Sequence, residues 1–169
     1  MQPSDAQKEA VNYRKDHISF QGLPISIENR KGTIRRGKDW QVRVPYDYGY
    51  IKRTEGADGD HVDVCIGPHY QSDHVFVVDQ HDHRSGKFDE HKVMLGYRTK
   101  SEAEHAYVGG FSDGKGSLRM KNMVAMPMAQ FKLWLKRGNT KKPTKSQSNI
   151  ERALNMTSLY SLGHDRDAG

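Results

Sequence analysis

The chain has 169 residues, of which 34% are hydrophobic and 28% are charged, and its formal net charge is +6 at pH 7. A chain of this length is expected to form one domain, and no apolar run approaches the roughly 20 residues of a membrane span. We therefore expect a soluble, cytoplasmic protein without a membrane partner. The single cysteine, Cys65, excludes an internal disulfide and is expected to be a small buried hydrophobe. The positive charge favours anionic partners, either phosphates or nucleic acid.

The predicted elements begin with a short helix and continue as strands. The segment "SDAQKEAVNYRKDH" starts with a capping residue, Ser4 or Asp5, and is rich in helix formers, so residues 1–17 are predicted to be a helical extension. From Ile18 onward, short runs of alternating apolar and polar residues are separated by turns about every ten residues. This pattern predicts about five or six strands.

Two helices are predicted after the strands. In "SEAEHAYVGGF", Ser101 and Glu104 have the spacing of a capping box, and a glycine pair ends the segment. In "PMAQFKLWLKRG", the large apolar residues Phe131, Trp134 and Leu135 share one helical face. We expect that face to belong to the core.

Together these elements predict an α+β fold, with a small OB-like, closed or nearly closed β-barrel flanked by helices. The barrel and its helices are expected within residues 18–137. Residues 138–169 are predicted to form a basic linker and a C-terminal helix or tail. The basic tail is a candidate contact for nucleic acid, although a small phosphate compound is the favoured partner, and an oligomer is compatible with the sequence.

The stretch "GADGDHVDVCIGP" crowds three aspartates, Asp58, Asp60 and Asp63, into six residues. Like charges this close repel one another unless a cation lies between them, and carboxylate oxygens suit hard ions such as Mg²⁺ or Mn²⁺. Because a strand alternates its faces, the apolar residues of "VDVCI" are expected on one side and Asp63 with Cys65 on the other. The alternative is a solvated turn that precedes a strand.

The longer segment "VPYDYGYIKRTEGADGDHVDV" resembles the signature region of the soluble (family I) Mg²⁺-dependent inorganic pyrophosphatases, in which "NYGYI" or "DYGFI" leads into "DGDPxDV". The agreement runs from Tyr46 to Val64 without a gap, and the whole resemblance covers about Ile18 to Phe111. The sequence is similar above all to the divergent pyrophosphatase-like domains of phage and mobile-element proteins. The resemblance implies hydrolysis of inorganic pyrophosphate to two phosphates by a metal-bridged water, with Mg²⁺, or else Mn²⁺, as cofactor.

The resemblance also implies which residues form the site. The metal ligands would be the carboxylates Asp58, Asp60, Asp63, Asp82, Asp89 or Glu90, and Glu28. Asp60 would also be the base that helps to ionise the bridging water. The residues that bind the substrate or assist catalysis would be Arg36, Tyr48, Lys92, Lys31 and Tyr107. Glu90 keeps the family's spacing to the lysine, whereas Asp89 keeps its residue type.

Three departures from the family pattern widen the choice of function. His61 stands where the family has proline, Val44 replaces a tyrosine, and Tyr107 is followed by Val108 in place of lysine. They favour, as an alternative, a hydrolase of another phosphoanhydride, such as a nucleotide diphosphate. Pyrophosphate is nevertheless expected to be the preferred substrate, because the implied phosphate-binding residues Tyr48, Arg36 and Lys92 include no base-stacking platform.

Two further alternatives remain. The first is a non-catalytic binding module that retains the aspartates and uses the basic tail. The second is a zinc site at His81, His83 and His91 in "HDHRSGKFDEH". Zinc is the less favoured metal, because the sequence offers no cysteine pair and its acids suit magnesium better.

Overall fold

A computed structural model of the chain describes residues 16–144. The helix predicted within residues 1–17 lies largely outside this range, and residues 16 and 17 already belong to the first strand. The described elements, in chain order, are β1 (Asp16–Phe20), β2 (Leu23–Asn29), β3 (Ile34–Arg36), β4 (Gln41–Arg43), β5 (Asp47–Ile51), β6 (Val62–Ile66), β7 (His74–His81), β8 (Phe88–Leu95), α2 (Lys100–Gly109), α3 (Gly116–Arg119), β9 (Met120–Pro127) and α4 (Met128–Arg137). The helices between residues 16 and 144 are all too short or too polar to span a membrane.

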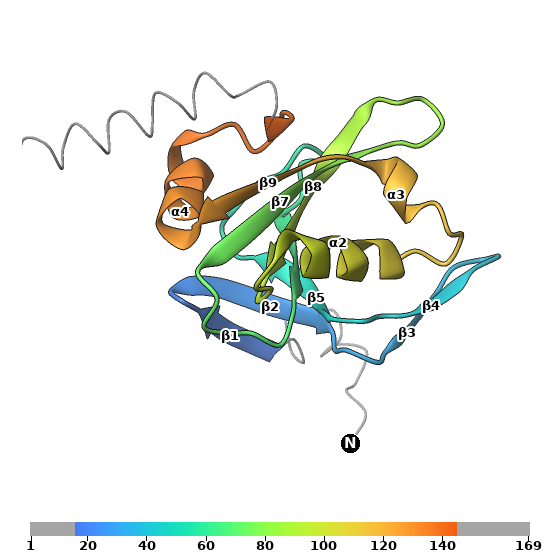
Figure 1. Cartoon of the computed structure of the whole chain (residues 1–169), viewed down its shortest axis with the longest axis horizontal. Helices are drawn as coiled ribbons and strands as arrows, with labels where there is room; N and C mark the ends of the chain where they lie inside the picture. The colour runs from blue at the N-terminus through green and yellow to red at the C-terminus, as the bar shows by residue number, and fades with distance from the viewer. Residues whose placement is uncertain (1–15, 145–169) are drawn as a thin grey trace, which may run out of the picture.

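The strands form an open, curved sheet in place of the predicted barrel (Figure 1). Seven strands pair in the order β1-β2-β5-β6-β8-β7-β9, and β6 and β8 are the parallel pair in a sheet that is otherwise antiparallel. The two edge strands β1 and β9 do not pair with each other. Helix α4 extends from β9 to the β1–β2 turn, where Lys132 donates a hydrogen bond to the carbonyl of Gln21. The α+β prediction is therefore confirmed, whereas closure of the barrel was wrong, because a helix covers the gap between the edge strands.

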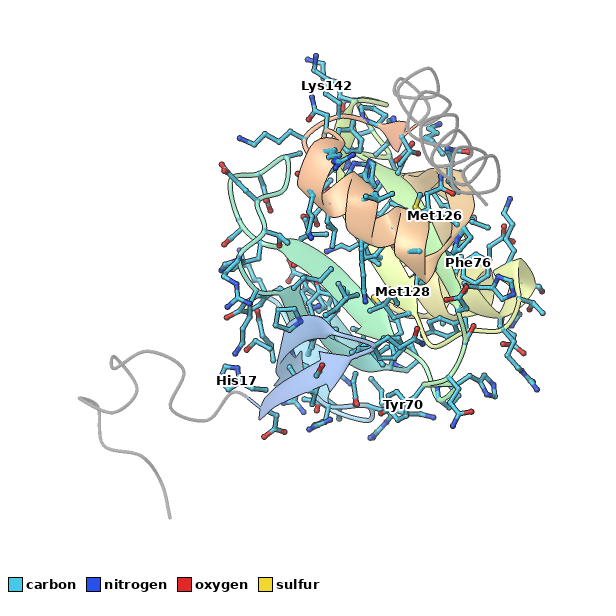
Figure 2. The ribbon with its side chains drawn as sticks, turned by 90° about the vertical axis from the view of Figure 1, so that its left-hand side faces the viewer. His17, Tyr70, Phe76, Met126, Met128 and Lys142 are labelled. Carbon is cyan, nitrogen blue, oxygen red and sulfur yellow. The ribbon has the colours of Figure 1, made fainter. Side chains whose placement is uncertain are left out.

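The two faces of the sheet have separate cores. On the first face, Val62, Val64 and Ile66 of β6 pack with Phe131 and Trp134 of α4. Figure 2 shows α4 lying across this face, with Met126 and Met128 beside it. The alternation predicted for "VDVCI" is confirmed, and so is the apolar face predicted for the helix in "PMAQFKLWLKRG". Full burial of each of these aromatic side chains stabilises the fold by about 1.5–3 kcal/mol.

Helix α2 covers the opposite face, where Ala103 and Tyr107 pack on Cys65, Phe76 and Met94. The N-cap of this helix lies two residues before the predicted cap, Ser101. Its N-cap is Thr99, whose hydroxyl accepts a hydrogen bond from the amide of Glu102. Since "TKSE" has the same spacing as the "SEAE" pattern, the sequence contains two overlapping capping boxes that start two residues apart.

A two-stranded hairpin formed by β3 and β4 projects from the sheet beside α2 (Figure 1). Its strands have little buried surface, and Ile34 and Trp40 are among the exposed large apolar residues.

Residues after α4 continue to pack on the sheet as far as Thr144. Thr144 is buried, and its backbone amide and side-chain hydroxyl both donate hydrogen bonds to the Asp79 carboxylate. The carbonyl of Lys142 lies 2.8 Å from Nε2 of His91. A linker was predicted to begin at residue 138, but the first residues of this segment contact β7 and β8. The C-terminal helix predicted further along the same segment lies outside the described residues.

Candidate active site

Three neighbouring strands present polar side chains on the α2 face of the sheet. Tyr50 of β5 is the register partner of Asp63 on β6, and Asp63 is the register partner of Lys92 on β8. Because side chains two residues apart share a face, Tyr48 and Glu90 lie on this face as well. The strand pairing thus gathers residues from three separate parts of the chain.

The Lys92 ammonium group is the centre of this cluster. Its Nζ donates hydrogen bonds to Oδ2 of Asp63 at 2.6 Å and to the hydroxyl oxygen of Tyr48 at 2.7 Å, and it lies 2.7 Å from Oε1 of Glu90. The Tyr48 hydroxyl donates in turn to Asp63 at 2.8 Å. The side chains of Lys92, Asp63 and Glu90 are only 13%, 22% and 15% exposed, so these charges interact with little screening by water.

Burial and pairing have opposite effects on the pKa values in this cluster. Burial by itself lowers the pKa of Lys92, but its three oxygen partners raise that pKa well above the ordinary value. Burial raises the pKa of Glu90, and although Lys92 lowers it, the net shift is upward, since the charges of Asp63 and Asp58 also disfavour ionisation. The cluster therefore has an excess of negative charge that a further cation would relieve.

A tight loop between β5 and β6 carries Asp58 and Asp60. The amide of Gly56 donates to the carbonyl of Asp60, the amide of Asp60 donates to Oδ1 of Asp58, and Gly59 adopts a positive φ of 81°. The Thr54 hydroxyl donates to the carbonyl of Ile51 and accepts from the amide of Val62, which ties the two strand ends together. These bonds fix the position of the loop relative to the sheet.

Glu28 reaches the same region because of an irregularity in β2. The register of β2 and β5 shifts between Ile27 and Asn29, so Glu28 is the extra residue of a β-bulge. It lines a cavity of about 450 Å³ together with seven other residues, which are Arg35, Tyr48, Tyr50, Asp58, Asp60, His61 and Asp63. The structure thus brings the predicted acids Glu28, Asp58, Asp60 and Asp63 around one cavity.

The donor set fits a hard divalent cation in its chemistry. Carboxylate oxygens from Glu28, the Asp58–Asp63 segment and Glu90 are the ligands that Mg²⁺ and Mn²⁺ prefer. Within residues 16–144, no three acidic, histidine or cysteine side chains are already close enough together to hold a metal ion. The positive charge of Lys92 lies between Asp63 and Glu90 in the present arrangement. Metal binding would therefore require side-chain rearrangement.

The structure places five other predicted residues away from this cavity. Asp82 caps its own turn by accepting from the amides of Arg84 and Ser85. Asp89 accepts a hydrogen bond from the side-chain amide of Gln80. The hydroxyl of Tyr107, another of the five, donates to the oxygen of the same amide. The backbone amide of Lys31 donates to Asp47, and the side chain is exposed. Arg36, the fifth, is exposed on β3.

Arg35 lines the acidic cavity, whereas its neighbour Arg36 does not. The guanidinium carbon of Arg35 lies 4.9 Å from the centre of the Tyr48 ring. The resemblance implied Arg36, by position and without a gap, but adjacent residues of a strand point to opposite faces, so a shift of one residue exchanges them. The alternation of "TIRRG" provided no signal that could have separated the two arginines.

The residues that depart from the family pattern have defined structural roles. The His61 imidazole stacks on the Tyr50 ring at a centroid distance of 4.3 Å and an interplanar angle of 9°. Val44 is buried against α2 residues. The three histidines considered for zinc do not form a metal site in the described part of the chain, and His91 instead contacts Asp79 and Trp134.

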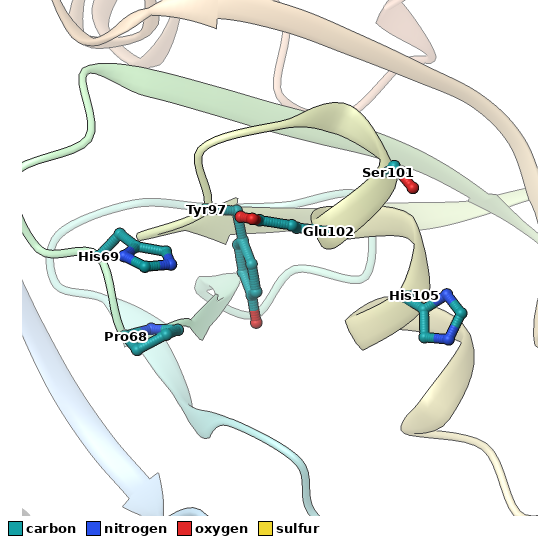
Figure 3. Close-up of a pocket in the computed structure, with 6 residues that line it drawn as sticks. All are labelled: Pro68, His69, Tyr97, Ser101, Glu102 and His105. Carbon is teal, nitrogen blue, oxygen red and sulfur yellow. The ribbon is translucent and has the colours of Figure 1, made fainter.

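A separate cavity of about 400 Å³ lies between the end of β6 and α2 (Figure 3). In this view Tyr97 lies at the centre, with His69 on one side and His105 on the other. The carboxylate of Glu102 in its wall already accepts hydrogen bonds from the backbone and guanidinium of Arg98. This cavity has no acid cluster, and so it is not the candidate active site.

Comparison with known protein families gives a match over most of the chain. A family model described as Inorganic Pyrophosphatase matches residues 5–136, which include every residue that lines the acidic cavity. No curated protein matches the chain.

Proposed function

Because the chain belongs to the inorganic pyrophosphatase family, we propose that it hydrolyses inorganic pyrophosphate to two phosphates with the help of a divalent cation. The observation that carries this proposal is the Lys92 cluster beside the acidic cavity. A buried ammonium group shared by Asp63, Glu90 and Tyr48 adjoins a cavity lined by Asp58 and Asp60. Phosphate-binding cations and metal-binding carboxylates are thus available within one site.

The lysine, arginine and tyrosine would bind and orient the substrate. Lys92 has three hydrogen-bond donors, and a phosphate oxygen that replaced one of its present acceptors would receive a charge-assisted hydrogen bond. Arg35 lies at the cavity wall, where its guanidinium group would contact a second phosphate. Tyr48 would act as a positioning residue, since its hydroxyl holds both Lys92 and Asp63.

The acids would hold the metal and receive the proton. Asp58, Asp60 and Asp63, with Glu28 and Glu90, are the candidate ligands. Bound divalent cations would neutralise phosphate oxygens and lower the pKa of water. Among the described residues, the side chain of Asp60 accepts no hydrogen bond, so this carboxylate is available as the general base. We propose Asp60 for that role.

Phosphate release from pyrophosphate, measured with Mg²⁺, Mn²⁺ or Zn²⁺, tests this function. Asp60→Asn is expected to lower turnover by about 10²–10⁴, the scale for loss of a general base or a comparable electrostatic group. The control is Asp73→Asn, an exposed aspartate before β7 whose backbone carbonyl, which the substitution preserves, bonds to Met128. It should retain wild-type turnover.

Thermal unfolding provides a readout of metal binding that does not depend on turnover. A bound cation stabilises the folded state by about 2.7 kcal/mol when its concentration is 100 times the Kd. We expect Mg²⁺ to raise the Tm of the wild type more than that of Asp60→Asn. No phosphate release with any of the metals, or equal release from wild type and Asp60→Asn, would contradict the proposed hydrolysis.

A further inference from the structure

A second cavity adjoins the candidate active site and shares Arg35 with it. Its volume is about 360 Å³, and it lies between the β3–β4 hairpin and the segment that follows α2. Its walls include Trp40 and Val42 on one side and Phe111, Asp113 and Arg119 on the other. The acidic cavity is lined by carboxylates and tyrosines, whereas this one combines aromatic side chains with an arginine–aspartate pair.

Trp40 provides a flat, accessible aromatic surface in this cavity. The residue is 46% exposed, although tryptophan is usually well buried. Its indole lies against the backbone of Gly37, where an added Cβ would come within 2.0 Å of Nε1. The amide of Gly37 also donates to the carbonyl of Trp40 at 2.9 Å. The indole is therefore held by its own turn while much of its surface remains open.

Arg119 provides a second planar group. Its guanidinium group donates to both carboxylate oxygens of Asp113, at 3.0 and 2.7 Å, and its central carbon lies 4.5 Å from the centre of the Phe111 ring. Pairing with Asp113 and stacking on Phe111 fix the plane of the guanidinium. Planar guanidinium and indole groups are the surfaces on which nucleobases stack.

Arg35 connects the two cavities. It lines both of them, and among residues 16–144 its guanidinium group makes no ion pair with a carboxylate. From the carboxylates through Arg35 to Trp40, the order of the groups matches a molecule with a phosphate chain at one end and an aromatic ring at the other. The Asp113 carboxylate, whose side chain is 40% exposed, would accept from an amino or hydroxyl group of such a molecule.

We infer that this cavity is a base-binding subsite, which lets the enzyme take nucleoside polyphosphates with the base against Trp40, Arg35 on the phosphate chain, and the terminal phosphates in the acidic cavity. The inference rests on the proposed hydrolase function, because it uses the same cavity for the phosphates. It also revises the sequence-based expectation that no base-stacking platform exists.

Tryptophan fluorescence tests the subsite directly. The chain has two tryptophans, and since Trp134 is only 1% exposed, quenching by a ligand reports mainly on Trp40. Wild-type protein with Mg²⁺ is titrated with the imido analogue of ATP, which is not hydrolysed at its terminal bridge, and separately with imidodiphosphate, which has phosphates but no base. We expect the nucleotide analogue to quench the fluorescence and to bind more tightly than imidodiphosphate.

Substitution of the stacking residue sharpens the test. Trp40→Ala, followed by calorimetry, is expected to weaken binding of the ATP analogue by about 5- to 100-fold, the range of one lost base-stacking contact. Binding of imidodiphosphate should weaken much less. The matched control is Tyr70→Ala, which removes another exposed aromatic residue, far from this cavity in the fold.

The outcomes separate this inference from the proposed function. In one outcome imidodiphosphate binds and pyrophosphate is hydrolysed, but the nucleotide analogue binds no more tightly than imidodiphosphate, or Trp40→Ala leaves its affinity unchanged. That outcome would refute the base-binding subsite and leave the proposed hydrolase function supported. If neither compound binds, both proposals fail. A single-stranded oligonucleotide that binds more tightly than the nucleotide analogue and competes with it would replace this inference with a nucleic-acid surface.

Discussion

Three carboxylates, Asp79 on one side of the comparison and Asp63 with Glu90 on the other, lie on neighbouring central strands and have very different surroundings. Asp79 of β7 accepts hydrogen bonds from the amide and hydroxyl of Thr144 at 3.0 and 2.7 Å, and its Oδ1 lies 3.1 Å from Nδ1 of His91. Asp63 and Glu90 instead share one ammonium group beside an open acidic cavity.

The pKa values reflect this difference. Burial by itself raises the pKa of Asp79, but the interactions with His91 and Thr144 lower it below the ordinary value. The pKa of Glu90 is raised, mainly by burial. Burial of a carboxylate therefore does not by itself reveal its role. A fully bonded carboxylate stabilises the fold, and one that retains uncompensated charge is suited to binding a cation.

The largest expected effect on stability is that of Asp79→Asn. The substitution removes the charge opposite His91 and turns an amide group toward donors, so we expect a loss of about 3–5 kcal/mol in the free energy of unfolding, measured with urea. Asp113→Asn alters an exposed aspartate paired with Arg119 and should shift the urea midpoint far less. Equal losses in the two variants would show that Asp79 has no special structural role.

A smaller effect, on catalysis this time, is expected at the pair of adjacent acids on β8. Glu90→Gln removes a partner of Lys92 and a candidate metal ligand, and should lower kcat/KM for pyrophosphate by about 10², or ~2.7 kcal/mol. Asp89→Asn changes a carboxylate that bonds to Gln80 outside the cavity and should cost much less. The reverse order would identify Asp89 as the functional acid.

Removal of the segment after α4 tests whether this segment stabilises both the surroundings of Asp79 and the acidic cavity. A chain ending at Asn139 loses the Thr144 bonds to Asp79 and also the contacts of Thr140 and Lys141 with Glu55, next to the loop of Asp58 and Asp60. We expect a loss of about 1–2 kcal/mol in stability and a lower kcat/KM. A chain ending at Thr144 keeps these contacts and serves as the control. If both chains behaved alike, the segment would have no bracing role.

The smallest expected effect is a pH dependence of opposite sign in the two groups. Because the folded-state pKa of Asp79 is lowered, its stabilisation is complete above the unfolded-state pKa of about 3.9 and is lost as the pH falls through the lower folded value. Because the pKa of Glu90 is raised, the metal-free protein gains stability from this group as the pH falls through that raised value. Urea unfolding from about pH 7 to pH 3, compared between wild type and each of Asp79→Asn and Glu90→Gln, would isolate the two contributions. Differences of the same sign would contradict this assignment.

Part of the site could be predicted from short-range patterns. Alternation along "VDVCI" placed Asp63 opposite the apolar residues, and the spacing in "GADGDHVD" brought Asp58 and Asp60 to the same cavity. The helical face of Phe131 and Trp134 was equally visible. These predictions succeeded because the period of a strand or a helix is a local property of the backbone.

The sequence by itself thus determined the acid cluster, the elements on which it lies and the family to which the chain belongs. Only the tertiary structure decided that Arg35 lines the cavity in place of Arg36, that Glu90 contacts Lys92 while Asp89 does not, and that the residues up to Thr144 pack on the sheet. The first two depend on strand register and on bulges, where a shift of one residue reverses the face of every side chain. The third depends on contacts between residues far apart in the chain, such as Thr144 and Asp79, and no local period indicates such contacts.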